Sequence, residues 1–186
     1  PMEPTPSSAA LAIDHYPTIE KMLGDIKSHF GFKYDLRKAI TVFKEKFPYK
    51  SKQVSFPNQD GKIKFSGTIT YPNSTDSTQK FPSVILFTGS GAQDRDESIG
   101  NHKPFAVISD YLTKAGYAVL RVDDRGAGFT KASPDKLKYT TVDLIEDGDA
   151  YFKFLALQPM VNTNKIFLVG HSEGGSIATG VAKKNP

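Results

Sequence analysis

Three short, mostly apolar runs, separated by stretches of helical periodicity, constrain the fold of this sequence more than any other feature. The runs occupy residues 84–87, 117–122 and 166–169. Apolar runs of this length are typical of strands that are covered on both faces. Strands that alternate with helices form parallel sheets, because each right-handed crossover returns the chain to the same end of the sheet. We therefore expect an α/β fold with a mostly parallel sheet and helices on both faces.

The stretches between and after these runs carry helix signals. An amphipathic pattern over residues 104–115 begins with a proline, which suits the first turn of a helix. Thr140 and Asp143 approximate a capping box for a second helix that ends near residue 157. A last helix is expected to begin near Gly174.

The first part of the chain divides into a helical segment and a β-hairpin. Apolar residues recur twice at helical spacing within residues 1–48, which we expect to form an N-terminal helical appendage. Residues 54–56 and 63–69 alternate between apolar and polar side chains around a turn at 58–61, which is typical of antiparallel strands. We therefore expect residues 49–186 to form the N-terminal part of a second domain, incomplete at its C-terminus, with this hairpin at the edge of its sheet.

Composition excludes several classes of function. The chain has no cysteine, which rules out disulfide scaffolds, thiolate metal sites and a cysteine nucleophile. No apolar run approaches the roughly 20 residues that cross a bilayer, so we expect no membrane span. Positive charge is concentrated in residues 21–52, where nucleic-acid or membrane binding competes with a solvated helix face. No nucleic-acid-binding module accompanies this charge, so we expect no nucleic-acid partner.

The segment 170–174, with the sequence GHSEG, lies between the third apolar run and the last helix. In a G-x-S-x-G turn the serine hydroxyl projects from a strained bend, and the two glycines leave room for the strand and helix backbones. The helix behind the serine directs N–H groups and partial positive charge toward a developing oxyanion. By itself the motif is weak, and a structural turn is the alternative. Its position between strand and helix favours Ser172 as a nucleophile.

The loop after the first apolar run, residues 88–96, contains two glycines. Backbone N–H groups that turn outward in such a loop suit an oxyanion hole. Gly-rich loops after strands also bind phosphates. Here no Gly-Lys-Ser/Thr sequence follows, and Asp94 stands where a dinucleotide fingerprint needs glycine, so the oxyanion hole is favoured.

Charged residues follow the first two apolar runs. In the loop 123–128, two carboxylates beside an arginine are compatible with metal binding or acid–base chemistry. We favour ion pairs of Asp124 and Arg125 that hold this turn together. The charged residues 94–96 of the preceding loop are expected to face water.

Taken together, these loops resemble those of the α/β-hydrolase superfamily, and more closely the bacterial esterase-like hydrolases related to serine aminopeptidases and dienelactone hydrolases. The resemblance covers about residues 52–186 and depends on several motifs that occur in the same order. The residues that carry it are 87–97 (FTGSGAQDRDE), 102–105 (HKPF), 110–112 (DYL), 120–128 (LRVDDRGAG) and 169–175 (VGHSEGG).

The resemblance implies a catalytic role for Ser172 as nucleophile and an oxyanion hole formed by the backbone N–H groups of Ser90 (or Gly91) and Glu173. Thr88 stands where the family usually has a histidine, a substitution that its relatives accept. Family members hydrolyse carboxylic esters, and some act on thioesters, amides or peptides. They need no cofactor, so we expect a small acyl ester as substrate and neither cofactor nor metal. Relatives of this kind are often exported, and a cysteine-free chain is compatible with that.

The sequence departs from the family in the rest of its catalytic triad. In this superfamily an Asp or Glu and then a His follow the nucleophile, but the residues after Glu173 include no Asp, Glu or His. All four histidines precede Ser172; we expect His171 to pack beneath the turn, and His102 does not match the position of the family's base. The acid and base are therefore expected outside residues 1–186, on a missing C-terminal portion or a second chain. The alternatives are a non-catalytic binding module on a hydrolase scaffold, and a peptidase or acyltransferase of the same fold.

Overall fold

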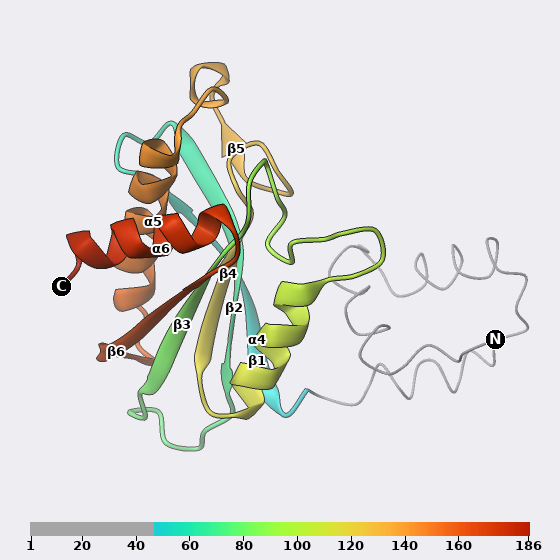
Figure 1. The fold of residues 1–186 in the computed structure, drawn as a ribbon. Helices are drawn as coiled ribbons and strands as arrows, with labels where there is room; N and C mark the ends of the chain where they lie inside the picture. Colours follow the sequence, from blue (N-terminus) through green and yellow to red (C-terminus); the bar gives the residue numbers. More distant parts are fainter. Residues whose placement is uncertain (1–46) are drawn as a thin grey trace, which may run out of the picture. The chain divides into compact units, whose positions relative to one another are not determined.

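The computed structural model describes residues 47–186, and the helices expected within residues 1–48 lie in the part of the chain that it does not describe. Residues Pro48–Pro186 form one unit, in which a single mixed sheet is flanked by helices (Figure 1). The strands are β1 (Tyr49–Pro57), β2 (Ile63–Pro72), β3 (Phe81–Phe87), β4 (Ala118–Val122), β5 (Lys131–Ala132) and β6 (Val161–Gly170). The helices are α4 (Pro104–Lys114), the 3₁₀ helix η2 (Pro134–Lys136), α5 (Thr141–Ala156) and α6 (Glu173–Lys184).

The sheet has the strand order β1-β2-β4-β3-β6, with the short β5 paired to one end of β2. Strand β3 is parallel to both β4 and β6, whereas β2 is antiparallel to β1 and β4. The three predicted apolar strands therefore form the parallel part, and the predicted hairpin lies at its edge. This arrangement brings the carboxyl ends of β3, β4 and β6 to the same end of the sheet.

The hairpin follows the alternation in its sequence. Val54 pairs with Gly67 and Phe56 with Phe65, so that apolar residues of both strands share one face. At the turn, the side chain of Asn58 accepts a hydrogen bond from the backbone N–H of Ile63 at 3.0 Å. The other face carries the polar side chains, as the period of two predicts.

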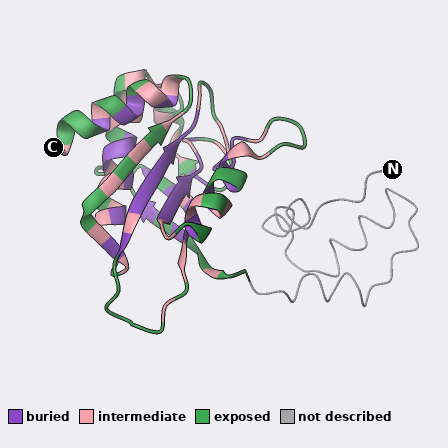
Figure 2. Ribbon diagram, turned by 60° about the horizontal axis from the view of Figure 1, so that its bottom comes forward, coloured by how far each residue is buried: buried purple, intermediate pink, exposed green. Residues whose placement is uncertain are grey.

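Helices cover both faces of the sheet. Helix α4 packs against β2 and β4 on one face, whereas α5 and α6 pack against each other and against β3 and β6 on the opposite face (Figure 1). Successive residues of β3 alternate between these layers: Ile85 and Phe87 join the core under α5 and α6, and Val84 and Leu86 join the core under α4. Figure 2 shows the central strands between these helices as largely buried.

The helix signals in the sequence are confirmed. Helix α4 begins at Pro104, and Gly116 has a φ of +101° directly after it, a left-handed conformation that favours glycine. At the start of α5, the carboxylate of Asp143 accepts the backbone N–H of Thr140 at 2.9 Å, as in a capping box. No helix among residues 47–186 combines the length and the apolarity that a bilayer crossing needs.

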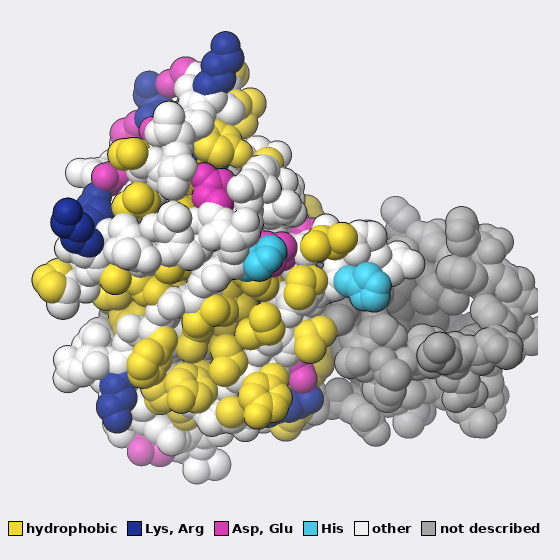
Figure 3. All heavy atoms as spheres, viewed as in Figure 1, with side chains coloured by type: hydrophobic (Ala, Val, Ile, Leu, Met, Phe, Trp, Pro, Cys, Tyr) yellow, Lys and Arg dark blue, Asp and Glu magenta, His cyan; other side chains and the backbone are white. Residues whose placement is uncertain are grey.

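Strand β6 differs from its prediction in extent and in burial. It begins at Val161 rather than at residue 166. Its residues Phe167 and Val169 are 49% and 43% exposed, so the expectation of a strand covered on both faces is wrong for this part of the molecule. Among residues 47–186, β6 pairs only with β3, and exposed apolar side chains gather on this side of the described part in Figure 3. Strand β5 was not predicted, because two residues are too few to show a period.

Candidate active site

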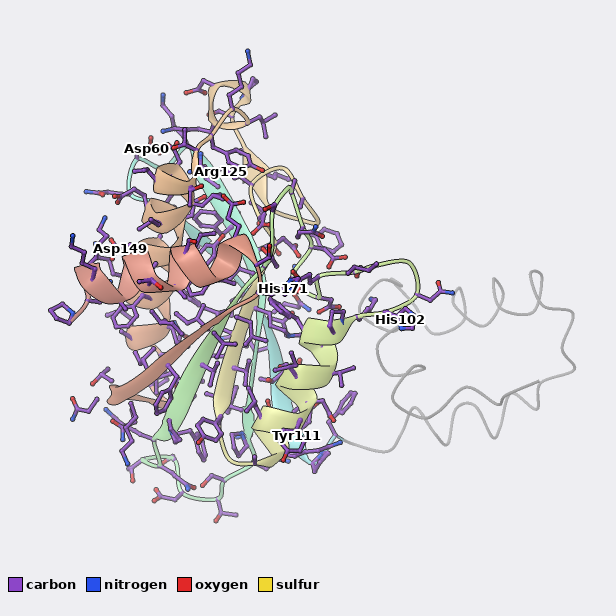
Figure 4. All side chains as sticks on the ribbon, viewed as in Figure 1. Asp60, His102, Tyr111, Arg125, Asp149 and His171 are labelled. Atoms are coloured by element: carbon purple, nitrogen blue, oxygen red, sulfur yellow. The ribbon has the colours of Figure 1, made fainter. Side chains whose placement is uncertain are left out.

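The three loops singled out in the sequence leave the sheet at one end, because β3, β4 and β6 are parallel. The register of β3 and β6 pairs Phe87 with Gly170 and places the glycine loop beside the serine turn. The backbone N–H of His171 continues this pairing by donating to the carbonyl of Phe87 at 3.1 Å. Figure 4 shows His171 where β6 meets α6. The topology thus unites segments that lie far apart in the sequence.

Ser172 occupies the tip of the turn between β6 and α6. Its φ of +52° and ψ of −120° fall in a region that residues with a Cβ rarely adopt. The residue is exposed, and its hydroxyl does not cap α6, although Ser172 directly precedes this helix. The side chain therefore sits on a strained backbone and projects from the first turn of α6.

The two glycines of the motif are required by close backbone contacts. A Cβ added to Gly170 would lie 2.0 Å from the carbonyl oxygen of Gly174, and one added to Gly174 would lie 2.2 Å from the carbonyl oxygen of Phe87. Real Cβ atoms do not approach other atoms so closely. The structural reason inferred from the sequence, room for the strand and helix backbones, is confirmed at both positions.

The predicted oxyanion-hole residues lie on the two segments that meet here. Ser90 and Gly91 are exposed on the glycine loop, and Gly91 has a φ of +93°. Glu173 is the first residue of α6, where backbone N–H groups have no partner within the helix. Its side chain is turned away to accept a hydrogen bond from the hydroxyl of Thr141 at 2.6 Å. The glycine loop comes close to the serine: a Cβ added to Gly89 would lie 3.5 Å from the Cβ of Ser172.

Glu97 is a residue of this site that the sequence did not single out. Its buried carboxylate oxygen Oε1 accepts the backbone N–H of Gly89 at 2.7 Å and contacts Nδ1 of His171 at 2.8 Å. The His171 side chain is 63% exposed, so the expectation that it packs beneath the turn is wrong. Glu97 belongs to the run that carries the family resemblance, but no local pattern connects it with a histidine 74 positions away.

Arg95 was expected to face water, and it is buried instead. Its guanidinium donates five hydrogen bonds, two to the carboxylate of Asp123 at 3.0 and 2.7 Å and the others to Gln53, Thr68 and Ser66. Asp123 is equally buried. The bidentate pair satisfies both charges and fastens the loop after β3 to β2 and to the end of β4.

The carboxylates on either side of Arg95, Asp94 and Asp96, also form polar contacts. Asp96 is buried and forms an ion pair with Arg121, and its other oxygen lies 3.5 Å from Nζ of Lys103. The carboxylate of Asp94 accepts the backbone N–H groups of Asp96 and Ser98 at 3.0 and 3.1 Å. The expectation of solvated charges fails, because Asp96 fastens the loop to β4 through Arg121, and Asp94 binds backbone groups within the loop.

Asp124 and Arg125 hold different contacts from those expected. The carboxylate of Asp124 forms no ion pair within residues 47–186; it accepts hydrogen bonds from the hydroxyl of Thr88 at 2.8 Å and the backbone N–H of Gln93 at 3.0 Å. Burial is the main factor that raises the pKa of Asp124 to about 7. The carboxylates of Asp147 and Asp123 raise this pKa further, and the two hydrogen bonds oppose the rise.

Arg125 reaches across to α5 rather than closing its own turn. Its guanidinium forms a bidentate ion pair with Asp147 at 2.6 and 2.9 Å, and it lies 5.3 Å from the ring centre of Tyr139. The sequence therefore predicted that Arg125 forms an ion pair, but the carboxylate that it binds lies on α5 and not in the loop 123–128. Among residues 47–186, no three His, Asp or Glu side chains are grouped in a way that could hold a metal ion.

His102 lies apart from the serine turn. It forms a small bridge with Ile99 on the exposed loop before α4, well separated from His171 in Figure 4. The structure therefore brings together Ser172, Glu173 and the glycine loop that contains Ser90 and Gly91, and leaves His102 outside this group.

A mixed sheet covered by helices on both faces, with a strained serine turn at the carboxyl end of its parallel strands, is typical of α/β-hydrolase folds. Solved structures agree with this assignment. The α/β hydrolase GrgF from Penicillium sp. matches with a TM-score of 0.58 and 22% identity, over 72% of this chain and 41% of that one. Acetyl xylan esterase 1 from Thermoanaerobacterium sp. matches with a TM-score of 0.57 and 18% identity, over 77% of this chain and 47% of that one.

Sequence comparisons identify more specific relatives within the α/β-hydrolase fold. Residues 99–186 match the model of the family described as "Serine aminopeptidase, S33". Esterase EstD of Thermotoga maritima is 32% identical over 119 residues, which cover 64% of this chain and 27% of that esterase. The chain thus spans about a quarter of the length of this curated relative. The chain has the α/β-hydrolase fold, and its resemblance to esterase-like hydrolases related to serine aminopeptidases is confirmed.

Proposed function

We propose that this chain belongs to a serine hydrolase that cleaves carboxylic ester or related acyl bonds, with Ser172 as the nucleophile. The observation that carries the proposal is the backbone of Ser172, which has a φ of +52° at an exposed turn between a parallel strand and the start of a helix. Strain of this kind persists where function requires it. The similarity to Esterase EstD and to an acetyl xylan esterase supports an ester as the substrate.

In the proposed reaction the hydroxyl oxygen of Ser172 attacks the acyl carbon of the ester. The negative charge on the carbonyl oxygen is stabilised by the backbone N–H groups of Glu173 and of Ser90 (or Gly91), and the partial positive charge at the start of α6 adds to this effect. The bond to the alcohol then breaks, and the serine proton passes to the departing oxygen. Water hydrolyses the acyl-serine and restores the hydroxyl.

The proton transfer requires a base, which we assign to a histidine outside residues 1–186, oriented by an acid also supplied from outside. Two observations support this assignment. The resemblance places the base after the nucleophile in the chain, and no histidine follows Ser172 among residues 173–186. His102 lies on a separate loop, and His171 is the residue next to Ser172 on the same turn. A serine hydroxyl without a partnered base reacts poorly at neutral pH.

Labelling of the native protein with a fluorophosphonate probe tests the proposal. We expect covalent labelling at Ser172 and none in a Ser172→Ala variant. Ser176→Ala is the matched control, since Ser176 is an exposed serine one turn further along α6; it should label as the wild type does. Native protein that takes up no label would contradict the proposal and favour a non-catalytic binding module.

Substrate preference is tested with the same protein. An ester, p-nitrophenyl acetate, is compared with an aminoacyl p-nitroanilide, which differs in the leaving group. We expect faster hydrolysis of the ester. Preference for the anilide would instead favour a peptidase of the same fold, and transfer of the acetyl group to an added alcohol would favour an acyltransferase.

A further inference from the structure

One buried carboxylate beside the candidate site is not used in the proposed reaction. Glu97 is 4% exposed, and its Oε1 lies 2.7 Å from the backbone nitrogen of Gly89 and 2.8 Å from Nδ1 of His171. Gly89 directly precedes Ser90, and His171 directly precedes Ser172. A single oxygen atom therefore connects the glycine loop to the serine turn.

The backbone of Glu97 is itself strained. Its φ is +52°, a left-handed value that is unusual for a residue with a long side chain. The carbonyl of Asp94 accepts the N–H of Glu97 at 2.9 Å, and the Asp94 carboxylate holds the N–H groups of Asp96 and Ser98. The buried ion pairs of Arg95 and Asp96 fix the same turn against the sheet. A strained conformation persists only where its surroundings determine it in this way.

The hydrogen bond between Glu97 and the backbone of Gly89 also determines which N–H groups of the glycine loop remain to bind a substrate. The N–H of Gly89 is used by Glu97, and those of Gln93, Arg95 and Asp96 are used by other carboxylates. Ser90 and Gly91, which directly follow Gly89, therefore remain as candidate donors. Gly89 has little space to move: a Cβ added there would lie 3.1 Å from Oε1 of Glu97 and 3.5 Å from the Cβ of Ser172. An oxyanion needs its donors at about 2.7–3.1 Å. The separation of the two segments therefore decides whether both donors can reach one oxygen atom.

We propose that Glu97 is a positioning residue that fixes the distance between the glycine loop and the serine turn, and with it the geometry of the oxyanion hole. The inference rests on the function proposed above. Glu97 does not touch substrate and acts through Gly89 and His171. Because both contacts involve Oε1, a neutral amide oxygen in the same place can accept both hydrogen bonds, and the negative charge is not required.

The test compares Glu97→Ala with Glu97→Gln in the native protein, with p-nitrophenyl acetate as substrate. A misplacement of about 1 Å costs about 100-fold in rate, so Glu97→Ala should lower kcat by about this factor. KM should stay within about twofold, because ground-state binding is not altered. Glu97→Gln should restore kcat to near the wild-type value. Glu146→Ala, which removes a surface partner of Lys184, is the control and should leave kcat unchanged.

Two kinetic results would overturn the inference: an unchanged kcat in Glu97→Ala, or a Gln variant as slow as the Ala variant. If Glu97→Ala does not fold, His171→Ala carries the test, because this exposed ring supplies one of the two contacts. Loss of one contact should lower kcat by about tenfold at constant KM. An unchanged kcat in that variant would also contradict the positioning role.

A measurement without substrate separates this inference from the proposed function. The amide proton of Gly89 should resonate downfield in NMR spectra of the wild type and Glu97→Gln, and move upfield in Glu97→Ala. A Gly89 resonance that does not move overturns the inference alone. Wild-type protein that neither labels nor hydrolyses the ester overturns the proposed function.

Discussion

At the scale of single residues, conformational restriction is concentrated in the loops at the carboxyl end of the sheet. Ser172 and Glu97 both have a φ of +52°, and they are the two residues other than glycine with positive φ among residues 47–186. Gly170 and Gly174 are held by backbone atoms within 2.2 Å of where a Cβ would lie. The strain is tolerated because neighbouring backbone segments leave no alternative path.

Gly174→Ala should therefore lower the free energy of unfolding by about 2–3 kcal/mol, because the new methyl group would collide with the carbonyl of Phe87. Gly175→Ala is the matched control. Its Cβ would have its nearest neighbour at 3.9 Å, and alanine favours a helix more than glycine does. The control should be neutral or stabilising in urea denaturation. Equal losses in the two variants would contradict the packing argument.

Asp124 should make stability depend on pH. Its pKa rises from 3.8 to about 7 in the folded protein, mainly because of burial, so the folded state binds the proton more tightly than the unfolded state. The stability that this proton contributes is complete below about pH 4 and is lost as the pH rises toward 7. Asp124→Asn keeps an oxygen acceptor for Thr88 and Gln93 without the charge.

The expected result is that Asp124→Asn is more stable than the wild type at pH 8, by about 1–3 kcal/mol, and equal to it near pH 4. Urea denaturation at pH 4, 6 and 8 measures the difference. Asp135→Asn is the control: hydrogen bonds to Ser133 and Lys62 lower the pKa of this exposed carboxylate, so its substitution should bring no gain at pH 8. A gain for Asp124→Asn that is the same at every pH would refute the assignment.

At the scale of elements, the sequence predicts most of the secondary structure and few of the polar contacts. Hydrophobic periodicity and helix-capping residues predict the hairpin, α4, α5 and the three parallel strands, because these signals are local in the sequence. The partners of Arg95 and Arg125 are 28 and 22 positions away, and no periodic pattern encodes such distances. For the same reason Glu97 was not recognised, although the serine turn and its glycines were.

The pair of Arg95 and Asp123 is the contact that should matter most for docking the loop after β3. Arg95→Met leaves the buried Asp123 without its cation, which should cost about 3–5 kcal/mol of unfolding free energy. Lys62→Met is the control, because the pair of Lys62 and Asp135 is more than half exposed on both sides. It should change stability by less than about 1 kcal/mol. Chemical denaturation measures the unfolding free energy of both variants. Similar losses of stability in the two would show that the burial of the Arg95–Asp123 pair does not cause the larger effect.

At the scale of the whole molecule, the alternation of strands and helices was sufficient to predict the α/β fold. It was not sufficient to predict which surfaces are covered. Phe167 and Val169 lie in an apolar run of the sequence and yet are partly exposed, since β6 has a single neighbouring strand among residues 47–186. Burial depends on what packs against a strand, and a strand's own sequence does not contain that information.

The pairing of Phe87 with Gly170 has a further consequence for the proposed active site. Ser172 follows one strand and the glycine loop follows the other, so their alignment is a property of the hydrogen-bond register between β3 and β6. A shift of one residue along a strand moves the backbone by about 3.3 Å and turns every side chain to the opposite face. The alignment of the proposed site and the hydrophobic core would then be lost together, so the proposed activity should disappear whenever the pairing of β3 and β6 is lost.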